Sequence, residues 1–184
     1  MMNIRIERTT HPAIKPDSHD LGFGKIFTDH MFMMDYSPEQ GWHDARIVPF
    51  GPLSLHPACT ALHYGAEIFE GLKAYRRPDG EVQLFRPTEN IRRMNQSAER
   101  LCLPQIPEED ALEALTAFVR SEKDWTPSAE GTSLYLRPFM LGNDQTLGVH
   151  TIHRALFVII ASPVGSYYPE GINPVRIMIE DRDV

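Results

Sequence analysis

Two long β-type runs in the last third of the chain constrain its fold more than any other feature. They cover residues 132–141 and 154–162, and the second contains the continuous apolar sequence ALFVIIA. Branched and aromatic residues at this density are typical of buried strands. The segment 142–153 between the runs contains Gly, Asn and Asp and is predicted to be a loop. A chain with two such runs is expected to build a sheet.

Shorter segments earlier in the chain add strands to this sheet. Aromatic residues mixed with turn signals predict strands near 27–35 and 45–49. Residues 72–77 and 82–85 flank Pro78-Asp79-Gly80, a sequence typical of a hairpin turn because glycine accepts a positive φ.

Two consecutive helices are predicted between the hairpin and the two long runs. Thr88 suits the N-cap of the first helix, whose apolar residues recur at helical spacing until it ends before Pro104. The second helix begins after Pro107 with three acidic residues, whose charge suits the positive end of the helix dipole. We therefore predict an α+β domain, in which a mostly antiparallel sheet is covered by two consecutive helices.

The polarity of the chain suggests four parts. Residues 1–20 are polar and are predicted to be a mobile N-terminal arm or loose edge, and residues 21–164 form the small α+β domain. Glycine and proline in residues 165–174 predict an inter-domain linker. Residues 175–184 begin with VRIMI, a strand pattern with no partner left in the sequence, so we expect the first strand of a truncated large domain.

Composition excludes several classes of protein. The 184 residues carry a net charge of −7, which argues against a general nucleic-acid binder. Cys59 and Cys102 form no disulfide framework. The N-terminus lacks an apolar core of signal-peptide length, and no run approaches a membrane span, so we expect a cytoplasmic protein without membrane contact.

Arg137 is the most informative charged residue. In LYLRPFML the two-residue period of a strand places Tyr135, Arg137 and Phe139 on one face and Leu134, Leu136 and Met140 on the other. A charge between two aromatic residues needs a partner or a ligand, because burying it unpaired is costly. Two interpretations are open: a core arginine satisfied by a carboxylate or carbonyls, or a residue of a substrate pocket.

Other candidates are ambiguous from pattern alone. Arg93 lies off the apolar stripe of its helix, as a solvated surface arginine would, and Tyr64 and Phe69 fit core aromatics. His150 and His153 lie in a loop without a nearby cysteine or clustered carboxylate, so no metal site is expected. The sequence contains no P-loop, dinucleotide glycine fingerprint or nucleophile elbow.

Four motifs in order resemble one family. They are FTDHMF (27–32), LHYGAEIFEGLKAYR (62–76), LFRPTENIRRMNQSAERLCLP (84–104) and GTSLYLRPFMLG (131–142). The chain resembles the N-terminal domain of branched-chain amino acid aminotransferases, fold-type IV enzymes that use pyridoxal 5′-phosphate. The resemblance implies transamination between leucine, isoleucine or valine and 2-oxoglutarate, by a homodimer. It also places the family's Schiff-base lysine roughly a dozen residues after Val184, so we expect no catalytic residue in this chain and no activity of the chain alone.

The resemblance also implies roles for individual residues. Arg93 matches the arginine that binds the cofactor phosphate, a task suited to its planar fork. Arg137 is implicated in accepting the side-chain carboxylate of glutamate. The expected lining of the substrate pocket consists of Phe23, Tyr64, Phe69, Tyr135, Arg137 and Tyr167, with Tyr64 reaching the partner subunit's site. A loop of Leu147, Gly148 and Val149 would cap the neighbouring pocket. Lys73 lies in a key motif but does not match the Schiff-base lysine.

Two alternatives remain. One is a related pyridoxal-phosphate enzyme, a D-amino acid aminotransferase or an aminodeoxychorismate lyase, although these are not expected to carry both SLYLRPFMLG and RRMNQSAERLCLP. The other is a non-catalytic truncated homologue that serves as a dimerisation or regulatory module. The unpaired β-branched run after Pro174 argues against a chain selected to fold alone.

Overall fold

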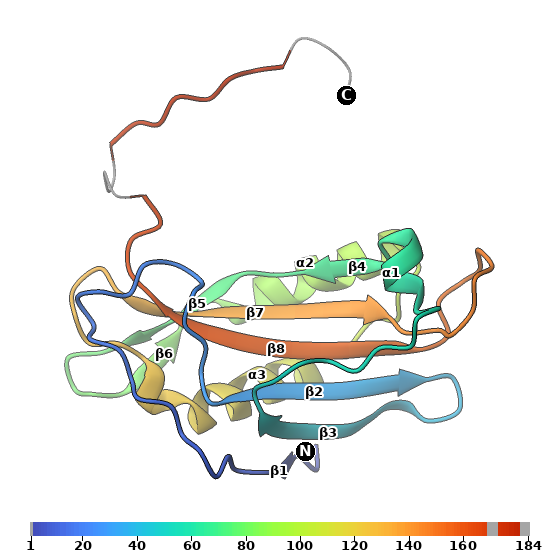
Figure 1. Ribbon diagram of the computed structural model, residues 1–184, viewed down its shortest axis with the longest axis horizontal. Coiled ribbons are helices and arrows are strands. Elements are labelled where there is room, and N and C mark those ends of the chain that lie inside the picture. Colours follow the sequence, from blue (N-terminus) through green and yellow to red (C-terminus); the bar gives the residue numbers. More distant parts are fainter. Residues whose placement is uncertain (1, 169–172, 181–184) are drawn as a thin grey trace.

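The computed structural model of the protein describes residues 2–168 and 173–180. Its main feature is one eight-stranded sheet in the order β1-β3-β2-β8-β7-β5-β6, in which β4 also pairs with β7 (Figure 1). The strands are β1 (Arg5–Ile6), β2 (His30–Ser37), β3 (Gly41–Pro49), β4 (Glu67–Phe69), β5 (Leu72–Arg76), β6 (Val82–Leu84), β7 (Ser133–Gly142) and β8 (Ala155–Val164). The helices are α1 (Thr60–Tyr64), α2 (Pro87–Arg100), α3 (Glu108–Ser121) and the 3-10 turn η1 (Lys123–Trp125). None of the helices in the described ranges has the length and apolar character needed to cross a membrane.

The two long β-type runs form the antiparallel pair β7–β8 at the centre of the sheet. Their register runs without a shift from Ser133 opposite Val164 to Gly142 opposite Ala155. All pairings are antiparallel except that of β1 with β3. The predicted α+β class with a mostly antiparallel sheet is therefore confirmed.

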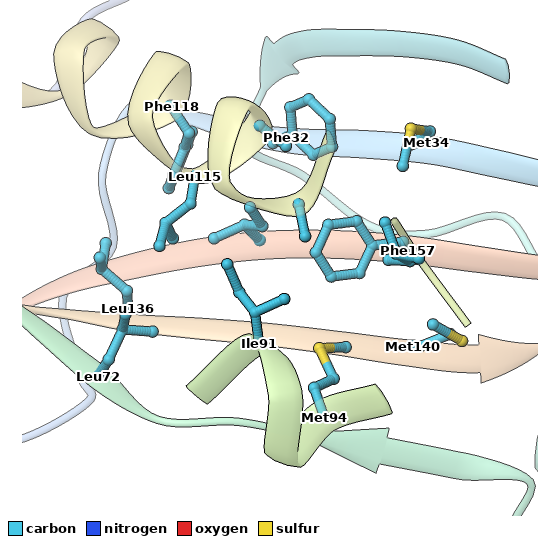
Figure 2. Close-up of a cluster of buried hydrophobic side chains, with 14 of the residues drawn as sticks. Phe32, Met34, Leu72, Ile91, Met94, Leu115, Phe118, Leu136, Met140 and Phe157 are labelled. Atoms are coloured by element: carbon cyan, nitrogen blue, oxygen red, sulfur yellow. The ribbon is translucent and has the colours of Figure 1, made fainter. Parts of the chain in front are cut away.

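The core lies between the sheet and the two helices, which cover the same face (Figure 1). Figure 2 shows side chains of both helices pointing toward those of the strands. Ile91 and Met94 come from α2, and Leu115 and Phe118 come from α3. On β7, Leu134, Leu136 and Met140 are fully buried against this layer, while Tyr135, Arg137 and Phe139 are only partly buried. The two-face prediction for this strand is confirmed, and Arg137 lies on the face opposite the helices.

Helix α2 begins two residues earlier than predicted. Its N-cap position is Arg86, in the left-handed conformation with φ 47° and ψ 48°, and Pro87 occupies the first turn. Thr88 is therefore not the N-cap, and that prediction was wrong. The physical reason is that the fixed φ of proline suits the first helical position, where no N–H is needed.

The N-terminal arm is an edge of the sheet. Strand β1 pairs in parallel with β3, and the backbone nitrogen of Glu7 donates to the carbonyl of Ile47 at 2.8 Å. The Met2 nitrogen also donates to Glu113 Oε2 at 2.9 Å. Residues 5–7 thus pair with β3 at the edge of the sheet. Backbone groups make this pairing, so the polar side chains could not show which strand the arm joins.

The end of the chain carries no regular element where it is described. Residues 173–180 form neither helix nor strand, and Ile177, Met178 and Ile179 are almost fully exposed. The strand predicted over 175–184 is thus absent from residues 175–180. Residues 169–172 and 181–184 lie outside the described ranges. The linker and the start of a second domain stay predictions.

Candidate functional site

Several of the residues singled out in the sequence meet on the face of the sheet opposite the helices. A hollow of about 210 Å3 there is lined by Phe23, Gly24, Phe27, Tyr135, Arg137, Ile160, Ala161 and Ser162. The ring centroid of Phe23 lies 5.1 Å from that of Tyr135 and 4.8 Å from that of Tyr167. The structure therefore brings Phe23, Tyr135 and Arg137 together around one partly aromatic hollow, and Tyr167 packs against Phe23 beside it.

Arg137 is held in this hollow by aromatic groups. Its guanidinium carbon lies 4.3 Å from the ring centroid of Phe69 and 5.4 Å from that of Tyr135, and its Nη2 donates to the Tyr135 hydroxyl at 2.9 Å. The buried Nε atom has no hydrogen-bond partner among the described residues. Within that part of the chain no carboxylate pairs with Arg137. Cation–π contacts of this kind contribute about 0.5–2 kcal/mol each and leave the positive charge available to an anion.

A break in the neighbouring strand places Phe69 over Arg137. Strand β4 pairs with residues 139–141 of β7 and β5 pairs with residues 134–136, so the gap between them falls opposite Pro138. The Glu70 nitrogen donates to the Pro138 carbonyl at 2.8 Å. The N–H and C=O groups of one strand residue face the same side of the strand. The position where Pro138 lacks an N–H therefore faces the gap between β4 and β5, and the sheet loses no hydrogen bond there. Pro138 thus sits beside an irregularity in the neighbouring strand.

Arg93 lies in the middle of α2 and is fixed by a buried carboxylate. Its Nε and Nη2 donate to Glu70 Oε1 and Oε2 at 2.6 and 2.7 Å. Glu70 is only 4% exposed, whereas the Arg93 side chain is 66% exposed. The Nη1 atom makes no hydrogen bond within the described residues. The Glu70 carboxylate therefore orients the Arg93 guanidinium, whose remaining donor atoms are exposed to solvent. This is the arrangement needed to receive an anion.

Glu70 has further donors that hold it in place. Asn90 Nδ2 donates to Oε2 at 3.0 Å, and the Gly71 nitrogen donates to the same oxygen at 3.2 Å. Burial alone would raise the pKa of Glu70, but the hydrogen bonds from Arg93 and Asn90 and the Arg93 charge outweigh it and hold the pKa below its ordinary value. The same pairing raises the pKa of Arg93. Neither Glu70 nor Asn90 was identified from the sequence, although Glu70 follows the apolar residues Ile68 and Phe69 in the motif of residues 62–76.

This pair predicts how stability depends on pH. Because the folded-state pKa of Glu70 is lowered, the stabilisation is complete above the ordinary glutamate pKa of about 4.3 and is lost as the pH falls through the lower folded-state value. The free energy of unfolding, measured in urea between about pH 6 and pH 3, is expected to fall less steeply for Glu70→Gln than for the parent chain. Equal slopes would show that Glu70 contributes nothing to the acid sensitivity.

Gly71 connects this pair to the aromatic hollow. Its carbonyl accepts from Asn90 Nδ2 at 3.2 Å, and a Cβ at this position would overlap the Tyr135 hydroxyl. Gly71→Ala is therefore expected to lower the free energy of unfolding by about 1–3 kcal/mol, the cost of overpacking. Thermal and urea denaturation check this. In a Tyr135→Phe background, which lacks the hydroxyl, the same substitution should cost less, and an unchanged cost would exclude this contact as the cause.

Tyr64 lies apart from the Arg137 hollow, at the other end of β7. Its hydroxyl donates to the carbonyl of Leu147, so the structure places it with the loop of Leu147, Gly148 and Val149. Tyr64 is 47% exposed and Phe69 is 60% exposed, and Leu147 and Val149 are also exposed. The pattern-based expectation that Tyr64 and Phe69 are core aromatics is therefore wrong. Both rings occupy strand or helix ends where the sheet face is uncovered.

Lys73 is the one lysine in the key motifs. It pairs with Tyr135 in the sheet register and lies on the same face as the hollow. It makes no ion pair within the described residues.

Comparison with known proteins identifies the family. The "Branched-chain-amino-acid aminotransferase 2" of Bacillus subtilis (strain 168) is 54% identical over 181 residues, which are 98% of this chain and 50% of that protein. The chain belongs to the branched-chain amino acid aminotransferase family. It spans about half the length of the curated relatives that it matches. No protein-family model matches it.

Solved structures of branched-chain aminotransferases share the fold. The T.th. enzyme with pyridoxamine 5′-phosphate superposes with a TM-score of 0.60 at 25% identity, over 83% of this chain and 43% of that one. The same enzyme complexed with N-(5′-phosphopyridoxyl)-L-glutamate gives a TM-score of 0.57 at 25% identity, over 78% and 41%. The resemblance to branched-chain aminotransferases that the four motifs indicated is thus confirmed.

Proposed function

We propose that this chain supplies the phosphate anchor and one wall of the substrate pocket of a branched-chain amino acid transaminase. The reaction is the exchange of an amino group between leucine, isoleucine or valine and 2-oxoglutarate, giving a branched 2-oxo acid and glutamate. The observation that carries the proposal is Arg137, a cation held by the rings of Phe69 and Tyr135 at the edge of an aromatic hollow. Such a site can accept both an aliphatic side chain and a carboxylate.

The residues present fit pyridoxal 5′-phosphate. Arg93 offers an exposed, oriented guanidinium to the phosphate, and solved relatives hold pyridoxamine 5′-phosphate and a phosphopyridoxyl-glutamate adduct. When bound, this cofactor supplies an electron sink for the carbon that carries the amino group. Arg93 would bind the phosphate, and Glu70 would fix the plane of the guanidinium so that its free donors point away from the protein.

The hollow supplies two kinds of binding energy. Phe23 in its lining provides apolar surface, with Tyr167 beside Phe23 and Phe69 beside Arg137. Each methylene that a substrate buries there contributes about 0.8 kcal/mol. Arg137 provides charged hydrogen bonds for the side-chain carboxylate of glutamate, which gains little from the apolar surface. The two substrates of one transaminase would thus use different groups of the same pocket.

The Tyr64 end of the molecule supports a homodimer. Leu62, Tyr64, Leu147 and Val149 leave large apolar groups exposed around α1 and the β7–β8 loop. Contiguous exposed apolar groups mark interaction surfaces in soluble domains. In the proposed dimer this surface reaches the neighbouring pocket. The proposed enzyme acts in the cytoplasm on small amino and oxo acids.

The proposal is tested with a hybrid protein, in which this chain replaces the matching half of the Bacillus subtilis relative and is joined to the second half of that relative. Transamination of leucine, isoleucine and valine with 2-oxoglutarate is expected. Activity with D-amino acids and none with L-leucine would favour a related fold-type IV enzyme. Cofactor binding and dimer formation without any transamination would favour the non-catalytic module.

A further inference from the structure

A second group of reactive side chains lies in the loop between β7 and β8, outside the Arg137 hollow. Asp144, His150 and His153 each place one potential ligand atom within 4.8 Å of the others. The sequence argument against a metal site assumed that no carboxylate stood near these histidines. Asp144 shows that this assumption was wrong, because the loop folds back on its own first residues.

Asp144 is a buried and rigidly held carboxylate. It is 6% exposed, and its Oδ2 accepts from the backbone nitrogens of His153 at 3.0 Å and Arg154 at 3.3 Å. Its own carbonyl accepts from the Thr60 nitrogen at 3.1 Å, which ties it to α1. The other oxygen, Oδ1, faces His153 Nδ1 at 3.9 Å, too far for a hydrogen bond. The carboxylate is thus held in place through Oδ2, and Oδ1 remains able to bind a ligand.

His150 presents an unused nitrogen. Its Nδ1 bonds the Thr151 carbonyl at 2.7 Å, and since a carbonyl only accepts, Nδ1 carries the proton. In the neutral ring Nε2 is then the unprotonated nitrogen, and this atom is buried with no hydrogen-bond partner in the described ranges. A backbone carbonyl that fixes the tautomer from the far side of the ring is the usual support of a metal-binding histidine. The His150 ring stacks on that of His153, with centroids 5.6 Å apart and planes 8° apart.

We propose that Asp144, His150 and His153 bind one divalent transition-metal ion of the Zn2+ type. Two imidazole nitrogens and one carboxylate oxygen are donors that Zn2+ accepts, and three protein ligands leave a fourth position for water. With metal–ligand distances of about 2.0–2.2 Å, tetrahedral donors lie about 3.4 Å apart. His153 is 61% exposed, so its side chain is free to close the remaining gap and the ion can enter from solvent.

Metal binding would fasten the β7–β8 loop. Asp144 stands near the start of this loop, whereas His150 and His153 stand near its end. An ion shared by the three residues would close the loop around Leu147, Gly148 and Val149, which contact Tyr64 through the Leu147 carbonyl. This role is independent of cofactor binding and does not rest on the proposed transamination.

The test is a titration of the 184-residue chain with Zn2+ after removal of bound metal by a chelator, with a competing indicator to measure affinity. One ion per chain is expected, and His150→Gln and His153→Gln should each weaken binding at least tenfold, roughly the loss seen even for outer-shell changes. His19→Gln, which alters an exposed histidine outside the loop, is the matched control and should bind as the parent does. Circular dichroism checks that each variant is folded.

A second measurement distinguishes a metal site from a purely structural role of His150 and His153 in the loop. Co2+ in the parent chain is expected to give the intense visible absorption of a four-coordinate site, and both loop variants should lose it. At one Zn2+ concentration, the rise in melting temperature should also be larger for the parent and for His19→Gln than for the loop variants. Absence of saturable binding at one ion per chain, or equal affinity in the parent and both loop variants, would overturn the proposal.

Discussion

Arg93→Ala is expected to remove most of the preference for a phosphorylated over an unphosphorylated pyridoxal. Each charged hydrogen bond to phosphate contributes about 1.5–3 kcal/mol, so the loss of one such bond lowers affinity roughly tenfold to a hundredfold. The measurement compares the dissociation constants of pyridoxal 5′-phosphate and pyridoxal, in this chain joined to the second half of its Bacillus subtilis relative. Affinity for pyridoxal should change little, because the phosphate contact is the one removed.

Arg92→Ala is the matched control for this experiment. Arg92 is the neighbour of Arg93 in sequence but points elsewhere on α2, where it pairs with Glu89 and Glu108 at the surface. Exposed pairs of this kind contribute about 0–1 kcal/mol, so the variant should retain both the cofactor and the phosphate preference. Equal loss of that preference in both variants would show that the phosphate is attracted by the general positive charge of α2 and that Arg93 is not a specific anchor.

The Arg93 variant also has a folding effect that has to be separated from binding. Removal of Arg93 leaves the carboxylate of Glu70 buried, with Asn90 and the Gly71 nitrogen as its remaining donors. Breaking a buried pair at one partner is costly. The double variant Glu70→Gln/Arg93→Ala should therefore regain stability without regaining the phosphate preference. Recovery of both properties would mean that the single variant had lost affinity through unfolding.

Periodicity was sufficient for most of the fold because it reports which face of an element is buried. The alternation in residues 134–140 correctly placed Leu136 and Arg137 on opposite faces of the strand, and the structure shows that Leu136 faces the core and Arg137 the open face. The same argument failed for Tyr64 and Phe69. An aromatic residue among apolar neighbours in the sequence can lie either in a core or on a sheet face that nothing covers. Burial depends on what covers the face, and that is decided by tertiary contacts.

The site was harder to predict because its key contacts are far apart in sequence. Glu70 and Arg93 are separated by 23 residues and meet only because α2 packs beside the break between β4 and β5. Asp144 reaches His153 because the loop reverses, and no spacing rule indicates this. Residue types suggested what each group can do, but which groups share a site followed from the topology of the sheet.

Arg137→Met is expected to separate the two substrates of the proposed transaminase. Methionine keeps apolar volume beside Phe69 and Tyr135 but removes the charge, so leucine should still find a hydrophobic surround. The carboxylate of glutamate would lose at least one charged hydrogen bond, which is worth about 1.5–3 kcal/mol and corresponds to a tenfold to hundredfold slower half-reaction. Single-turnover rates with each amino acid, measured in the joined protein, check this difference.

Tyr135→Phe shows whether orientation of the charge matters as well as its presence. The variant removes the hydroxyl that accepts from Arg137 Nη2 at 2.9 Å and retains the ring beneath the guanidinium. Its half-reaction with glutamate should slow less than that of Arg137→Met, and its reaction with leucine should stay close to the parent rate. If Arg137→Met slows leucine and glutamate equally, Arg137 holds the aromatic hollow together as a structural residue, and the pocket must recognise glutamate through another group.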